Sequence, residues 1–149
     1  MYKHILLPVD GSELSRKAEA ECMTFAKSIG AQVTAIHVVL HFHLDLLAMD
    51  SPKEMRTKIE HDHEEEIQTI ARKMLSELEM RAKAKGVRCG TLSVVGDSPY
   101  EEIIDHAVKR KCDLIMMASH GRRGLDAMLL GSETVKVLTH TKIPVLVVR

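Results

Sequence analysis

Aromatic residues are scarce in this chain, and neither sign of charge is in excess. Its 149 residues include no Trp, two Tyr and two Phe, and the 21 Lys and Arg residues match the 21 Asp and Glu residues in number. Proteins that bind nucleic acid usually present a basic surface, and those that hold single strands add aromatic side chains that stack on bases. The composition therefore argues against nucleic acid as the main partner.

Cysteines are few, and long apolar runs are missing. Cys22, Cys89 and Cys112 are widely spaced and include no Cys-x-x-Cys pair, which is typical of reduced thiols rather than of a disulfide framework. The apolar stretch near the start, residues 5–9, is too short for a signal peptide and far too short to span a bilayer. We expect a cytoplasmic protein without a membrane segment.

Short apolar runs alternate along the chain with longer segments of helical period. Five runs have the length and composition of strands: residues 4–9, 33–39, 87–95, 114–118 and 144–148. Four of them are almost continuously apolar, as strands covered on both faces are, whereas the more mixed third run suits an edge. The alternation predicts one α/β domain over residues 1–149, an open, Rossmann-like parallel sheet with helices on both faces.

Turn residues mark the expected ends of the helices. Gly30 and Gly86 are placed to end the first two helices, and Ser51 and Ser98, each with Pro next and Glu three residues on, predict capping boxes. The expected apolar faces are Leu14, Ala18, Cys22, Phe25 and Ile29 in the first helix, Ile67, Ile70, Met74 and Leu78 in the second, and Tyr100, Ile103, Ile104, Ala107 and Val108 in the third. Residues 40–66 lack a clear period, so they form either a loop leading into a long exposed helix or a partner surface.

A glycine-containing stretch, residues 118–132, follows the fourth predicted strand. Gly131 and Ser132 stand where a further helix begins, and a helix N-terminus with a hydroxyl group is a ready phosphate site. Arg122 and Arg123 would offset the charge of the phosphate. From local spacing alone, an equally good interpretation is that the stretch only connects the strand to the helix, with Ser132 as the cap of that helix. Neither a Walker A loop nor a dinucleotide-binding fingerprint is present.

Four motifs, taken in order, resemble the universal stress protein family. They are residues 8–12 (PVDGS), residues 36–38 (IHV), residues 119–132, in which Ser-His-Gly is followed by nine residues and then Gly-Ser, and residues 144–148 (PVLVV). The resemblance covers the whole chain. It implies a sheet of order 3-2-1-4-5, similar to the adenine-nucleotide α-hydrolase fold, and a match to the pattern Gly-x-x-Gly-x9-Gly-Ser/Thr of the ATP-binding branch. Ala118 replaces the first glycine of that pattern.

The resemblance also implies an adenine-nucleotide site. The expected binding residues are Pro8, Val9, Asp10, Val38, Met117, Ala118, Gly121, Arg122, Gly124, Gly131, Ser132 and Glu133. By the same resemblance, the residues that enclose adenine would be Pro8, Val9, Val38 and Met117. Asp10 would meet the ribose, and the glycines with Ser132 would hold the phosphates of ATP, ADP or AMP, together with Mg²⁺. From the residues alone, Val38 and Met117 read as core residues and Asp10 as a turn residue.

The resulting prediction is a regulatory protein of the universal stress response that binds ATP or another adenine nucleotide. The alternatives are a slow Mg-dependent ATP hydrolase and a dimeric scaffold without nucleotide. No catalytic residue is predicted, because Ser119 and His120 are adjacent only in sequence and no carboxylate partner is marked. A homodimer joined partly through residues 144–148 is expected, since that strand would otherwise leave an apolar edge open. The sequence does not identify a downstream protein partner.

Four histidines between residues 41 and 63 are possible metal ligands. His41, His43, His61 and His63 lie near residues 64–66, which are all Glu. Neighbouring positions on a helix do not face each other, so His61 and His63 would splay apart. We therefore expect a solvated charged face here and no metal site.

Overall fold

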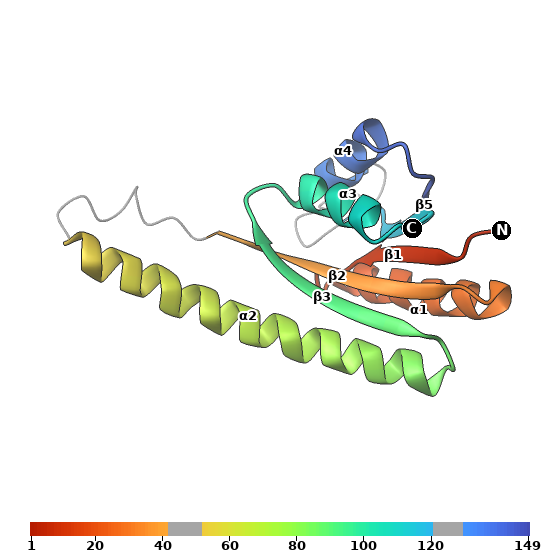
Figure 1. Ribbon diagram of the computed structural model, residues 1–149, viewed down its shortest axis with the longest axis horizontal. Helices are drawn as coiled ribbons and strands as arrows, with labels where there is room; N and C mark the ends of the chain where they lie inside the picture. The colour runs from red at the N-terminus through yellow and green to blue at the C-terminus, as the bar shows by residue number, and fades with distance from the viewer. Residues whose placement is uncertain (42–51, 121–129) are drawn as a thin grey trace.

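The computed structural model describes residues 1–41, 52–120 and 130–149, and its centre is a five-stranded parallel sheet of order β3-β2-β1-β4-β5 (Figure 1). The strands are β1 (His4–Pro8), β2 (Gln32–Leu40), β3 (Cys89–Gly96), β4 (Leu114–Ala118) and β5 (Val145–Val148). The helices are α1 (Glu13–Ile29), α2 (Lys53–Ala84), α3 (Pro99–Lys109) and α4 (Ser132–His140). The predicted fold class, strand order and edge position of the third strand are confirmed.

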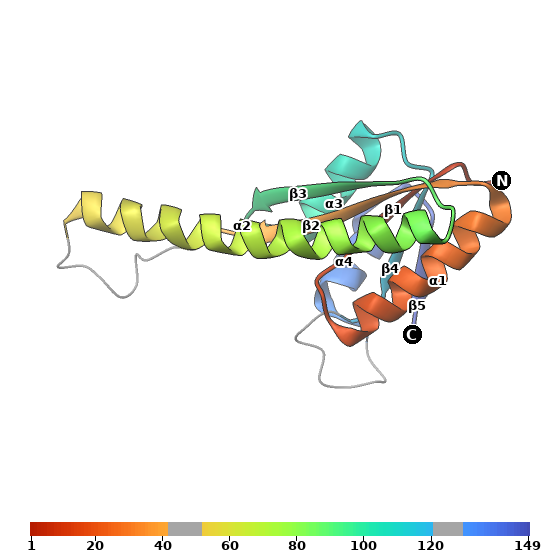
Figure 2. The same ribbon diagram turned by 90° about the horizontal axis from the view of Figure 1, so that it is seen from below.

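Helices cover both faces of the sheet, which explains why the strands are apolar on both sides. α1 and α2 lie on one face, where Leu7, Val33 and Met116 join α1 residues such as Cys22 in a buried cluster. α3 and α4 lie on the other face, as Figures 1 and 2 show together, where Leu6 belongs to a second cluster. Successive residues of each strand therefore point alternately into two separate hydrophobic cores.

The first helix has the ends that its sequence predicts. The Ser12 hydroxyl accepts a hydrogen bond from the Ser15 N–H at 3.1 Å, and Gly30 ends the helix in the left-handed region with φ 70°. An L side chain is strained at such a φ, so glycine suits this position. Ser98 is the N-cap of α3 and Pro99 is its first residue, as predicted, but the capping box itself is wrong, because the Ser98 side chain makes no cap hydrogen bond. Ser51 lies outside the described residues.

Two residues of the predicted apolar faces are exposed instead. Ile70 and Val108 are 60% and 63% exposed. The buried face of α2 is Ala71, Leu75, Leu78 and Ala82. The buried side chains of α2 all lie in its second half, and two of them, Ala71 and Ala82, are small residues that a hydrophobic pattern weights little. The helical period therefore located the helix but misplaced part of its contact face.

α2 is long, and its first half projects past the sheet, as Figures 1 and 2 show. Its 32 residues include none that are buried before Ala71. Of the two interpretations of residues 40–66, a long exposed helix is confirmed for Lys53 onward. Farther along, the Arg81 guanidinium donates two hydrogen bonds, of 2.7 and 3.0 Å, to the buried Glu19 carboxylate, which joins α2 to α1.

No helix within the described residues is long and apolar enough to cross a membrane.

Candidate functional site

The candidate site lies where the winding of the sheet reverses, between β1 and β4. These two strands pair in parallel, with Ile5 opposite Leu114 and Leu6 opposite Ile115, so their carboxyl ends lie side by side. The chain leaves β1 for α1 on one face, and it reaches α4 on the other face after β4. Open α/β sheets bind ligands in the crevice that this divergence creates.

The turn after β1 is held by its own polar side chains. The Asp10 carboxylate accepts a hydrogen bond from the Ser12 N–H at 2.9 Å, and the Asp10 N–H donates to the Ser15 hydroxyl at 3.1 Å. Gly11 between them has φ 77°. Asp10 is therefore a turn residue, as its position before the first helix predicts, and the turn fixes its carboxylate at the carboxyl end of β1.

The start of α4 is tied directly to the end of β4. The Gly131 N–H donates to the Ser119 carbonyl at 2.8 Å, and the Thr134 hydroxyl donates to the Ala118 carbonyl at 3.1 Å. Ser132 is the first residue of the helix and is exposed, while Gly131 occupies the N-cap position without a side-chain cap hydrogen bond. The interpretation in which Ser132 caps its helix is therefore wrong.

The apolar residues expected around adenine divide between the two faces of the sheet. Met117 is buried in the cluster under α3 and α4, and Val38 packs against the same cluster. Pro8 falls on that side too, because strand residues alternate and Leu6 belongs to this cluster. Val9 and Ala118 belong to the other cluster, under α1 and α2. Pro8, Val38 and Met117 therefore share one side, which is the side of α4.

The Glu133 side chain has a structural role that the sequence did not predict. One of its oxygens accepts a hydrogen bond from the Tyr100 N–H at 3.0 Å, and the other accepts from Lys136 at 2.8 Å. The carboxylate thus supplies an acceptor in the first turn of α3, where the predicted Ser98 cap makes no hydrogen bond. The same hydrogen bond from Lys136 raises the pKa of that ammonium group.

Ser119 and His120, at the end of β4, form a buried pair with one unsatisfied atom. The Ser119 hydroxyl and Nδ1 of His120 are 2.9 Å apart, which is hydrogen-bond distance. His120 is only 8% exposed, and its Nε2 is buried with no hydrogen-bond partner among the residues that the structure describes. A buried polar atom in that state costs about 1–3 kcal/mol. Sequence reasoning could not find this atom, because its isolation depends on packing.

A second histidine, His37, also supports the site and was not predicted. Its Nδ1 lies 2.7 Å from the Val9 carbonyl, and the Val9 N–H donates to the Ile36 carbonyl at 2.8 Å. These contacts hold the end of β1 against β2. A histidine among the otherwise apolar residues 35–40 of β2 was the available signal.

Three predicted binding residues, Gly121, Arg122 and Gly124, lie outside the described residues. Their roles stay predictions that rest on the family resemblance.

Histidines and carboxylates meet near the projecting half of α2. Ligand atoms of His61, Asp62 and Glu65 lie within 4.8 Å of one another, and all three residues are exposed. The group includes His61 without His63, as the helical spacing predicts. His41, at the end of β2, lies 2.8 Å from Glu64, and this hydrogen bond raises the pKa of its imidazole. Exposed ion pairs of this kind form readily without a metal.

The fold and these residues define a doubly wound α/β protein with its candidate ligand site at the switch point of the sheet. The model of the universal stress protein family matches residues 1–149, and the chain belongs to that family. It is 34% identical to universal stress protein MJ0531 of Methanocaldococcus jannaschii over 149 residues, which cover all of this chain and 83% of that protein.

Solved structures agree with this assignment. The structure of MJ0577, also from Methanocaldococcus jannaschii, superposes with a TM-score of 0.82 and 29% identity and covers 99% of this chain and 96% of that one. A universal stress protein solved in complex with cAMP has a TM-score of 0.71 at 22% identity, covering 99% of this chain and 97% of that one. At that identity the second likeness shows the shared fold.

Proposed function

We propose that this universal stress protein binds an adenine nucleotide, with ATP as the leading candidate, at the carboxyl ends of β1 and β4, and that it acts as a regulatory protein through its bound and empty forms. The observation that carries the proposal is the attachment of the α4 N-terminus to the end of β4 by the Gly131–Ser119 hydrogen bond. It brings a helix N-terminus to the switch point of the sheet, where ligands of such folds bind.

The start of α4 suits a phosphate group. The first N–H groups of a helix have no acceptor within the helix, and the helix dipole favours negative charge there. Gly131 has no side chain, and the exposed Ser132 adds a hydroxyl donor. Glu133 contributes through its backbone, because its carboxylate is already bonded to Tyr100 and Lys136.

The positions proposed for adenine and ribose follow from placing the phosphates at the start of α4. Pro8, Val38 and Met117 offer apolar surface on the α4 side, which suits adenine, while the Asp10 turn lies at the end of β1 and suits a ribose hydroxyl. Mg²⁺, a hard cation that prefers oxygen ligands, would be held mainly by the phosphates themselves. A family member of the same fold in complex with cAMP supports an adenine nucleotide as the ligand class.

Regulation is favoured over catalysis. Hydrolysis requires a group that orients the attacking water, and tight binding of the ground state does not lower the barrier. The Ser119–His120 pair has no carboxylate hydrogen-bond partner among the contacts of the described residues. We therefore expect any hydrolysis of ATP to be slow.

Calorimetry with Mg-ATP tests the site. Ser132→Ala should weaken binding by roughly 0.5–3 kcal/mol, because one hydroxyl-to-phosphate hydrogen bond is lost. Thr139→Ala is the matched control, since it removes an exposed hydroxyl from the other end of the same helix and should leave the affinity unchanged. If the parent protein binds no adenine nucleotide, or if both variants bind as the parent does, the proposed site is wrong.

A further inference from the structure

Basic residues gather at the end of the molecule where the strands begin. Because the sheet is parallel and its strands alternate with helices, all five described strands start, and all four described helices finish, at this end. Each strand is preceded, within five residues, by an exposed Lys or Arg. In the order of the strands across the sheet, these residues are Arg88 before β3, Lys27 before β2, Lys3 before β1, Lys111 before β4 and Lys142 before β5.

The segments at this end contain almost no acidic residue. They run from the last turn of each helix to the start of the next strand, and they are residues 1–4, 26–32, 81–89, 106–114 and 137–145. The further basic residues of these segments are Arg81, Lys83, Lys85, Lys109 and Arg110. The acidic residue among them is Asp113, whose carboxylate already accepts hydrogen bonds from backbone N–H groups. Arg81 is paired with Glu19, and we call the other nine basic residues the basic pole.

The nearest further acidic residues are set back from this end by about one helical turn, or about 5 Å. They are Glu77 and Glu79 in α2, Glu102 and Asp105 in α3, and Glu133 in α4. Asp105 lies 3.8 Å from Lys109, but both side chains are exposed, so the pair offsets little of the charge. Basic residues outnumber acidic ones even over the last two turns of the helices.

Helix dipoles explain only part of this pattern. Basic side chains are favoured near the C-terminus of a helix, where the last carbonyl groups carry partial negative charge. That effect fades beyond the last turn, whereas Lys3, Arg88 and Lys142 lie outside the helices. The basic pole is therefore more than a set of helix-end charges.

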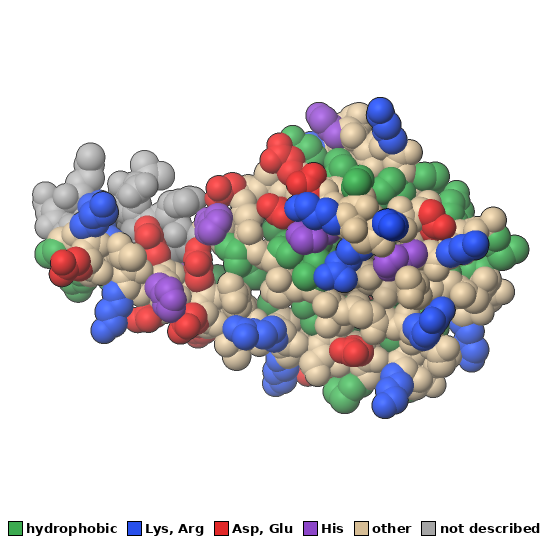
Figure 3. Space-filling view, viewed as in Figure 1, with side chains coloured by type: hydrophobic (Ala, Val, Ile, Leu, Met, Phe, Trp, Pro, Cys, Tyr) green, Lys and Arg blue, Asp and Glu red, His purple; other side chains and the backbone are tan. Residues whose placement is uncertain are grey.

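The basic pole is broad in two directions. Five strand starts spaced by about 4.8 Å make a row about 19 Å long. Further basic residues flank that row, with Lys83 and Lys85 from α2 on one face of the sheet and Lys109 from α3 on the other. This end lies to the right in Figure 1, and Figure 3, drawn from the same side, shows Lys and Arg predominating there and Asp and Glu gathering on the projecting part of α2.

We propose that the basic pole is a docking surface for the anionic face of a lipid bilayer, which the protein meets end-on and without inserting into it. A bilayer is flat on the scale of the protein, so residues from all five segments can approach its phosphates together. A nucleic-acid duplex is a convex cylinder and would touch only a strip of such a broad surface. Tyr2, the one Phe, Tyr or Trp residue in these segments, packs against the cluster under α1 and α2 and is not placed to stack on bases.

The contact would be electrostatic and reversible. Each Lys or Arg near an anionic bilayer strengthens binding by about fivefold. Docking at the strand starts leaves the opposite end of the sheet, where the nucleotide site is proposed, open to solvent. The membrane contact does not depend on nucleotide binding, and the two proposals fail separately.

Cosedimentation with lipid vesicles tests the proposal on the full chain. Vesicles of phosphatidylcholine with about 30% phosphatidylserine should bind the parent protein at about 0.1 M salt, whereas vesicles of phosphatidylcholine alone should not. Raising the salt to about 1 M should weaken binding about tenfold or more, because the Debye length falls from about 10 Å to about 3 Å.

A triple variant of the basic pole locates the contact. Lys3→Gln, Arg88→Gln and Lys142→Gln together should raise the lipid concentration for half-maximal binding by about thirtyfold or more, since each removes a factor of about five. All three residues are exposed, so the substitutions leave the cores intact.

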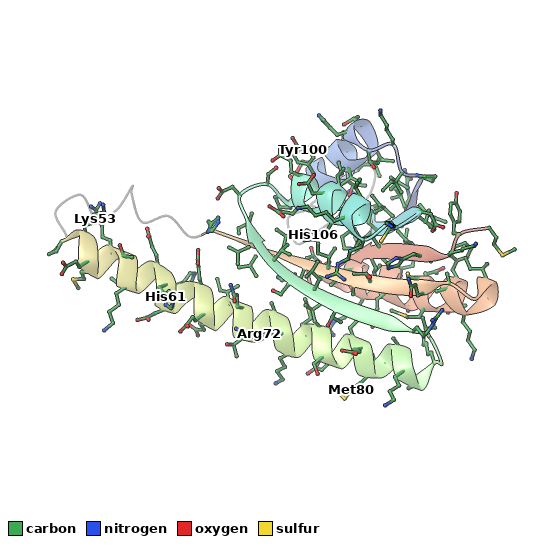
Figure 4. All side chains as sticks on the ribbon, viewed as in Figure 1. Lys53, His61, Arg72, Met80, Tyr100 and His106 are labelled. Atoms are coloured by element: carbon green, nitrogen blue, oxygen red, sulfur yellow. The ribbon has the colours of Figure 1, made fainter. Side chains whose placement is uncertain are left out.

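The matched control removes the same three charges, two from Lys and one from Arg, on α2. Lys53→Gln, Lys58→Gln and Arg72→Gln together should leave vesicle binding within about twofold of the parent, because these exposed residues lie more than a Debye length from the strand starts. Figure 4 shows Lys53 at the far end of α2 and Arg72 part of the way along it.

Several results would overturn the proposal. They are a parent that stays in the supernatant, equal binding to both kinds of vesicle, and equal effects of the two triple variants. Binding to duplex DNA that the basic-pole variant weakens, without binding to vesicles, would assign the surface to nucleic acid instead. Binding to polyglutamate under the same conditions, again without binding to vesicles, would assign it to an acidic protein segment.

Discussion

At the scale of single residues, His120 is the most informative side chain of the candidate site. Its Nδ1 is paired with the Ser119 hydroxyl, while Nε2 is buried at the end of β4 and meets no hydrogen-bond partner in the described part of the chain. A protein accepts such a cost more readily where a ligand removes it, as an oxygen of a bound nucleotide would. In that case the unpaired Nε2 would lower the stability of the nucleotide-free protein, and its hydrogen bond to the ligand would add to the binding free energy.

Two substitutions at His120 separate its two nitrogens. Asn can keep the hydrogen bond to Ser119 but lacks an atom at the position of Nε2, whereas Gln can place an amide nitrogen there. We expect His120→Asn to weaken Mg-ATP binding by roughly 1–3 kcal/mol, with His120→Gln closer to the parent. His120→Asn should not lower the free energy of unfolding of the nucleotide-free protein by more than about 1 kcal/mol, because an unpaired buried group is removed. Equal nucleotide affinities in calorimetry would show that Nε2 does not meet the ligand.

At the scale of the elements, a side chain at the start of β4 holds the start of β1. The Asp113 carboxylate accepts hydrogen bonds from the Lys3 N–H, at 2.8 and 3.1 Å, and from the His4 N–H, at 2.9 Å. Burial by itself raises the pKa of Asp113, but these backbone donors outweigh it and hold the pKa below its ordinary value of 3.8. The ionised form is therefore the one that the fold stabilises.

The depressed pKa of Asp113 predicts the sign of a pH effect. Its contribution to stability is complete above about pH 3.8 and is lost as the pH falls through the lower pKa of the folded state. Asp113→Asn should lower the free energy of unfolding at pH 7 by about 1 kcal/mol, and the difference from the parent should shrink in acid. Urea unfolding of both proteins at neutral and acidic pH measures this. A difference that grows toward low pH would contradict the assignment.

At the scale of the whole molecule, the described sheet ends at β5, which offers a surface for a partner. β5 pairs with β4 in the described sheet, and Leu146 in its middle is 37% exposed. An open apolar edge strand is a site for pairing with another chain, so we propose the homodimer through residues 144–148 that the sequence predicts.

The edge of β5 can be tested by a single substitution. Leu146→Lys should lower the mass seen by light scattering at micromolar concentration, because a charge on an exposed edge residue opposes strand pairing. Val108→Lys serves as the exposed apolar control. An unchanged mass for Leu146→Lys would place the dimer contact elsewhere.

The sequence by itself determined the class of fold and the region of the site, because both depend on local and periodic signals. Buried parallel strands require continuous apolar runs, and the end of α1 at Gly30 requires a residue that tolerates positive φ. The family motifs added the strand order and the candidate ligand. Only the tertiary structure decided which residues meet across elements: Glu133 with the start of α3, Asp113 with the start of β1, and the isolation of His120 Nε2. The tertiary structure also decided that Ile70 points outward and Ala71 inward. The weak hydrophobic period of α2 could not specify which of its faces packs on the sheet.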